Sequence, residues 1–207
     1  MSVRRLVAAI VALAAAVILL LLALDVGRWE TTLARGDVRF KATPTRSDLW
    51  RAHELLPFHA ARELLGVNDD ITYRDTLRAF WLGRPHGSTF ALTNLDALRS
   101  EAIVSLAGYV RNSREPRRRG QASNLLGIMG LGLATTDDPG QRLRFLQYAA
   151  KAFRNALTVD PNNEDAKFNL ELALRLLRQQ PTSTGGGKSH GPGRNAGAAL
   201  ALPGSGY

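Results

Sequence analysis

The chain contains no cysteine among its 207 residues. Without thiols it can form no disulfide bond, no thiolate metal site and no cysteine nucleophile, so a folded domain must rely on packing alone. The chain also lacks the alternation of apolar and polar residues that indicates β-strands. After an N-terminal apolar run, apolar residues recur three and four positions apart, which predicts an all-α domain.

No group of residues has the spacing of a catalytic, nucleotide or metal site. The segment Gly185–Ser189 imitates the end of a phosphate-binding loop, but Thr182 stands where that motif requires glycine. His53 and His59 lie six residues apart across Pro57, whereas zinc ligands on a helix favour a spacing of three or four. We therefore expect no enzyme activity, no catalytic residue, no metal, no cofactor and no small-molecule substrate.

The net charge of +9 is spread along the chain, which is typical of solvated helix faces. The densest basic group surrounds Glu115 and Pro116 and consists of Arg114, Arg117, Arg118 and Arg119. No aromatic residue is interleaved with these arginines, so stacking on nucleic-acid bases is not predicted. We expect a solvated basic loop, and the alternative is contact with an acidic protein or polymer.

The N-terminal apolar run extends over nineteen residues, Leu6 to Leu24, between Arg5 and Asp25. At about 1.5 Å per residue it can just cross a hydrocarbon layer of about 30 Å. It is longer than the apolar core of a signal peptide, which has about 7–15 residues. We predict an uncleaved transmembrane signal anchor over residues 1–25, with a cleaved signal peptide as the alternative.

The charges that flank this run predict its orientation. Arg4 and Arg5 precede it, while Asp25, Arg28 and Glu30 follow it and nearly cancel. By the positive-inside rule, the N-terminus stays in the cytoplasm and the rest of the chain lies outside. Just beyond the run, Trp29 suits either the outer membrane interface or the start of a packed domain.

Residues 26–46 are predicted to connect the span to the helical body, with Gly36 ending any extension of the membrane helix. Residues 47–112 are predicted to form the N-terminal helices of the body, and these are interpreted either as degenerate repeats or as an N-terminal cap. The first begins near Asp48, carries the apolar stripe Leu49, Trp50, Leu55 and Leu56, and resumes after Pro57 as far as Gly66.

Two further helices are predicted in this region. Asp69 or Asp70 caps one of them, and Thr93 or Asn94 caps the other. Their inward-facing side chains are predicted to be Tyr73, Leu77, Phe80 and Trp81, followed by Leu95, Leu98, Ala102, Leu106 and Tyr109.

Residues 113–180 are predicted to form a helical hairpin and a capping helix, Gln121–Ala134, Gln141–Val159 and Glu164–Gln179. Beyond them, residues 181–207 are rich in glycine and poor in large apolar groups. Such a segment buries too little surface to offset its ordering entropy, so we expect a disordered tail.

The hairpin resembles a tetratricopeptide repeat, a unit of about 34 residues with Leu-Gly in its first helix and Ala-x-x-x-Phe, then Pro, after it. Ser123 and Gly130 occupy the positions where Trp and Tyr are usual, and the interval between the two half-motifs is about ten residues too long. This length predicts an insertion over Thr135–Arg144. The matching residues are Leu126, Gly127, Ala149, Phe153, Ala156 and Pro161.

The whole layout is similar to small membrane-anchored tetratricopeptide proteins of bacterial gene clusters that also encode a MoxR-type ATPase and von Willebrand factor A proteins. The shared features are one N-terminal span, a helical body and a glycine-rich tail. This resemblance implies a location in the bacterial cytoplasmic membrane and a role in assembly. It also implies protein partners, among them von Willebrand factor A-type membrane proteins.

We therefore predict a scaffold or assembly factor that binds a partner protein in the groove of a helical repeat. First-helix residues line such a groove, and the candidates are Gln121, Asn124, Ile128, Phe168 and Asn169. Two alternatives are a non-catalytic tether that holds an anionic envelope polymer through its basic loop, and a subunit of an envelope enzyme.

Overall fold

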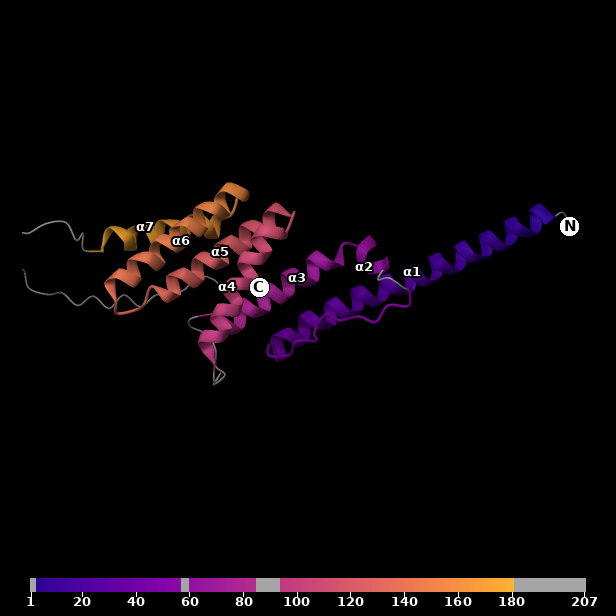
Figure 1. The fold of residues 1–207 in the computed structure, drawn as a ribbon, viewed down its shortest axis with the longest axis horizontal. Coiled ribbons are helices and arrows are strands. Elements are labelled where there is room, and N and C mark those ends of the chain that lie inside the picture. Colours follow the sequence, from indigo (N-terminus) through magenta and orange to yellow (C-terminus); the bar gives the residue numbers. More distant parts are fainter. Residues whose placement is uncertain (1–2, 57–59, 85–93, 181–207) are drawn as a thin grey trace, which may run out of the picture.

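The computed structural model describes residues 3–56, 60–84 and 94–180 and contains only helices and irregular segments in these ranges (Figure 1). This confirms the all-α class. Pro57, His59, the Gly185–Ser189 motif and the predicted tail lie outside the described residues. The helices are α1 (Val3–Ala42), α2 (Ala60–Leu64), α3 (Val67–Gly83), α4 (Leu95–Asn112), α5 (Pro116–Leu133), α6 (Pro139–Val159) and α7 (Glu164–Arg178).

Helix α1 has two halves with different surroundings. The apolar run forms its first half, which projects beyond the other helices with its side chains exposed (Figure 1). It is the one helix in the described residues that is long and apolar enough to cross a membrane. The second half, from Asp25 onward, packs against the body. Residues 26–42 are therefore helix and not a separate connector.

The predicted helix end at Gly36 is wrong, because α1 continues through this residue. Gly36 is buried where the segment after α1 folds back and places Leu49 and Trp50 against the helix. A Cβ atom at Gly36 would lie 2.6 Å from the carbonyl oxygen of Leu49. The glycine therefore permits close packing and does not terminate the helix.

Side chains of α1 hold the returning segment by hydrogen bonds. The Asp25 carboxylate accepts the backbone N–H of Leu55 at 2.8 Å and that of Leu56 at 2.9 Å. The Trp29 indole donates to Glu54 Oε1 at 3.0 Å, and Trp50 donates to an oxygen of Asp37 on α1. Trp29 is buried, so its role is packing.

The apolar stripe over residues 49–56 is not helical, in contrast to the prediction. Leu49 and Trp50 are buried against α1, and burial of an irregular segment gives the same apolar composition as one helix face. The helix predicted after Pro57 is reduced to the five residues of α2. Gly66 ends it with φ near +63°, a conformation that glycine adopts without strain.

Helices α3 and α4 form the first hairpin. Helix α3 begins at Val67, so Asp69 and Asp70 lie inside its first turn and do not cap it. Trp81 is 42% exposed and packs edge-on near Phe40, which corrects its predicted inward orientation. The core between α3, α4 and α5 contains Ala79, Ala102, Leu106, Tyr109, Ala122, Leu126 and Met129.

Helices α5 and α6 form the second hairpin, and α7 packs against both. The turn between them spans only residues 134–138, so the predicted insertion over Thr135–Arg144 is wrong. The additional residues lengthen the two helices instead. Asp138 makes this possible by capping α6, because it accepts the backbone N–H groups of Gln141 and Gly140, which also lower its pKa.

Candidate partner-binding surface

The residues of the repeat motif meet where α5 contacts α6. The Phe153 ring has no exposed surface and lies against Gly127, where a Cβ atom would be 2.5 Å from Phe153 Cδ1. Ala149 and Ala156 are also fully buried, which lets the helix backbones approach closely. The sequence pattern therefore located a real packing contact between two helices.

Two of the predicted partner-binding residues form a buried pair with each other. Asn169 Nδ2 on α7 donates to Asn124 Oδ1 on α5 at 3.0 Å, and both side chains are less than a tenth exposed. Truncating one of them would leave a buried amide without its partner, at a cost of about 1–3 kcal/mol of stability.

Gln121 also makes an internal contact. Its Oε1 accepts a hydrogen bond of 2.6 Å from the Tyr73 hydroxyl, which joins the first helices of the two hairpins. Gln121 is half-buried. The three polar candidates thus connect α3, α5 and α7 in series.

The two apolar candidates differ in exposure. Ile128 is half-buried and packs against the core of α5, α6 and α7, which contains Ala149, Ala150, Phe153 and Ala173. Phe168 is 53% exposed although it belongs to a well-packed helix. An aromatic side chain left in water to this extent is a candidate contact for another molecule.

Two further residues of this surface were missed in the sequence. Leu172 and Leu176 follow Phe168 at intervals of four and are partly exposed. With 3.6 residues per turn, both lie within about 60° of Asn169 around the α7 axis, and Asn169 points to α5. The spacing of four was the available sequence signal. We call Ile128, Phe168, Leu172 and Leu176 the α5–α7 surface.

The predicted basic loop is instead the beginning of α5. Helix α5 starts at Pro116, and the Glu115 carboxylate caps it by accepting the N–H groups of Arg117 and Arg118. Pro at the first position of a helix and a carboxylate before it are both favourable, so the signal was present in the sequence.

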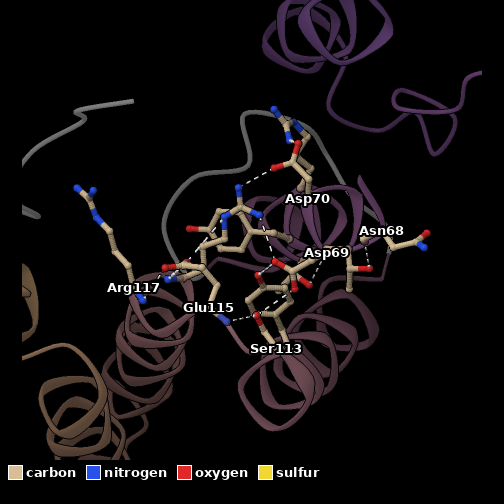
Figure 2. Close-up of polar contacts among 12 residues, drawn as sticks. Asn68, Asp69, Asp70, Ser113, Glu115 and Arg117 are labelled. Carbon is tan, nitrogen blue, oxygen red and sulfur yellow. Dashed lines mark hydrogen bonds and ion pairs between the residues drawn. The ribbon is translucent and has the colours of Figure 1, made fainter. Parts of the chain in front are cut away.

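Arg118 is the centre of a polar network that joins three helices (Figure 2). Its guanidinium lies 3.2 Å from Asp69 Oδ2 and 2.7 Å from Asp70 Oδ1 on α3. Asp69 also accepts hydrogen bonds from Tyr109 and Ser113 at the end of α4. Burial raises the pKa of Tyr109, and its contact with Asp69 acts in the same direction.

Ion pairing in this network neutralises one arginine of the predicted basic group. Arg118 is paired, while Arg114 and Arg117 are exposed, and Figure 2 shows Arg117 extending away from the network. The network continues to α1, because Arg74 forms ion pairs with both Asp70 and Asp37. The carboxylates of α3 therefore have a structural role in place of the predicted helix capping.

A hollow of about 330 Å³ lies between α1 and the junction of α2 with α3, lined among others by Val26, Leu33, Leu65, Asp70 and Arg118. Of its charged residues, Asp70 and Arg118 bind each other, and Glu30 is the third. In the part of the chain that the structure describes, no three His, Asp or Glu side chains gather as a metal site would require.

No protein-family model matches the chain, and neither the curated proteins nor the solved structures gave a match.

Proposed function

We propose that the protein is a membrane-anchored scaffold whose helical hairpins bind a partner protein at the α5–α7 surface. The observation that carries this proposal is the apolar stripe beside α5, in which Phe168 is 53% exposed and Leu172 and Leu176 are partly exposed. Such a stripe fits the apolar face of a partner helix. The partner would shield Phe168 from water on binding.

The packing of Phe153 on Gly127 supports a tetratricopeptide-like repeat as the finer identity of the second hairpin. In that reading α3 and α4 form a degenerate first repeat, and α7 is the first helix of a third. Partners of the von Willebrand factor A type, in the bacterial envelope, are proposed from the resemblance of the whole layout.

An uncleaved anchor is supported by the way α1 joins the body. Leu22, inside the apolar run, packs against the cluster that includes Trp29 and Ala61, and Asp25 holds the returning segment. Cleavage at the end of the run would remove the first of these contacts. We propose that the N-terminus lies in the cytoplasm and the body outside.

This orientation has a direct test. A reporter enzyme that is active only outside the cytoplasm, fused after Gln180, is expected to be active because Arg4 and Arg5 keep the N-terminus inside. A reporter that is active only in the cytoplasm should be silent at the same position. The reverse pattern would contradict both the orientation and the proposed partners.

Partner binding is expected to fail when a charge enters the α5–α7 surface. Phe168→Glu should reduce partner capture from native membranes at least tenfold, because the carboxylate must lose water in the contact. A tenfold loss needs only about 1.4 kcal/mol. The thermal midpoint should change little, since the parent side chain is half exposed. Quantitative mass spectrometry of crosslinked complexes measures the capture.

The matched control is Val104→Glu on α4, where the parent residue is 68% exposed. A partner of the α5–α7 surface should be retained by this variant. A further variant, Arg114→Glu with Arg117→Glu, tests the alternative of an electrostatic tether. If it loses the partner while Phe168→Glu keeps it, and if high salt also releases the partner, the tether is the correct function.

A further inference from the structure

Three exposed leucines lie on the segments that contact α1 near the end of its apolar run. Leu64 ends α2 and is 70% exposed, while Leu55 and Leu65 are each 43% exposed. The core beneath them is complete without these side chains, because Trp29, Leu49, Trp50, Ala61, Val67 and Ile71 are buried together there. The three exposed leucines are not part of that core, and we call them the leucine collar.

The height of the collar along α1 is fixed by two contacts. The Leu55 amide is bound to the Asp25 carboxylate at the end of the apolar run. Leu22, inside the run, packs against the cluster that contains Ala61 of α2, and the ribbon of α2 lies beside α1 (Figure 1). At 1.5 Å per residue, Leu22 is only about 4.5 Å from Asp25 along the helix axis.

We propose that the leucine collar inserts into the interface of the bilayer that α1 crosses, so that the body rests on the membrane surface. The inference depends on the proposed membrane anchoring. If the apolar run crosses the hydrocarbon layer, α2 is at the boundary between headgroups and acyl chains, where the apolar face of an interfacial helix lies about 5–10 Å deep. Lipid would shield leucine side chains in this position from water, so no protein partner is needed to cover them.

The collar is continuous with the lipid-facing surface of α1, which makes lipid its occupant. Ile18 and Leu19 lie on the same side of α1 as Leu22, about one turn before it, and are 55% and 64% exposed. Seating the collar would also orient the body. Helix α7 lies at the end of the molecule opposite the apolar half of α1, so the α5–α7 surface would be held away from the bilayer (Figure 1).

Because the chain has no cysteine, single positions can be labelled without altering others. Full-length Leu64→Cys, Leu13→Cys and Val104→Cys are labelled with an environment-sensitive fluorophore in phosphatidylcholine–phosphatidylglycerol vesicles. The parent residues are 70%, 67% and 68% exposed, so the three positions are matched in the protein alone. Nitroxide-bearing lipids and aqueous iodide are the quenchers.

The proposal predicts that lipid nitroxide quenches the label at Leu64 and at Leu13, while iodide quenches only the label at Val104. The label at position 64 should emit at a shorter wavelength than the label at position 104. If the Leu13 label is quenched by lipid but the Leu64 label behaves like Val104, the collar proposal is overturned and the anchor stands. If the Leu13 label is also open to iodide, the anchor itself fails, and the collar with it.

Discussion

Phe153→Ala is expected to lower the free energy of unfolding by about 3–5 kcal/mol, the usual cost of truncating a fully buried phenylalanine. The ring is inaccessible to solvent and belongs to the core shared by α5, α6 and α7. Its removal would leave a cavity at the centre of the second hairpin. For a chain of this length the thermal midpoint should fall by at least about 6 °C, as measured by near-ultraviolet circular dichroism in detergent.

Phe168→Ala is the control for this substitution, because it deletes the same atoms from a half-exposed position. Its effect on the midpoint should be small. If Phe153→Ala melts within a degree or two of the parent, the α5–α6 contact is not a core, and the repeat-like packing is incorrect.

Gly127→Ala is expected to destabilise the chain by about 1–3 kcal/mol, the usual cost of overpacking a core. Inside a helix this change ordinarily stabilises by about 0.5–1 kcal/mol, because alanine loses less backbone entropy than glycine. Here the new methyl would lie 2.5 Å from Phe153 Cδ1, so the ring or the helix must move. Thermal unfolding of the same preparation shows whether Gly127→Ala raises or lowers the stability.

The control Gly108→Ala is expected to stabilise the chain, since no atom lies within 4 Å of the position that a Cβ would take on α4. Combining Gly127→Ala with Phe153→Ala should remove the penalty, because the clashing ring is absent. A Gly127→Ala chain that is as stable as Gly108→Ala would mean that α5 and α6 are further apart than the structure places them.

The sequence was most informative where local signals agreed with packing. Ala149, Phe153 and Ala156 lie on one stripe of α6, and the turn at Pro161 ends that helix, so the pairing of α6 with its neighbours followed from periodicity. The Leu126-Gly127 part of the repeat motif lies where α5 contacts α6. These are short-range patterns that a single helix carries in its own residues.

The sequence was least informative where a contact joins distant segments. The apolar stripe from Leu49 to Leu56 has helical spacing, but Leu49 and Trp50 are buried by their contact with α1, a separate helix earlier in the chain. Asn124 and Asn169 have the composition of a helix surface, and only the fold brings them together. No local pattern could predict either contact, because each depends on the path of the chain between its two ends.

The candidate site was predicted in part for the same reason. Phe168 was identified from the repeat pattern and is exposed, whereas Gln121 is occupied by Tyr73. Leu172 and Leu176 were assigned no role, since their exposure depends on α7 being the last described helix. A further packed helix on α7 would cover them, and a partner helix is proposed to take that place.

The most direct test of partner binding at the α5–α7 surface uses a photoreactive phenylalanine analogue in place of Phe168. The full chain is irradiated in native membranes, and adducts are identified by mass spectrometry. The proposal predicts one defined protein adduct at position 168, none at position 104, and loss of the adduct when Leu172→Glu is added. Equal adducts at positions 168 and 104, or an adduct that survives Leu172→Glu unchanged, would contradict it.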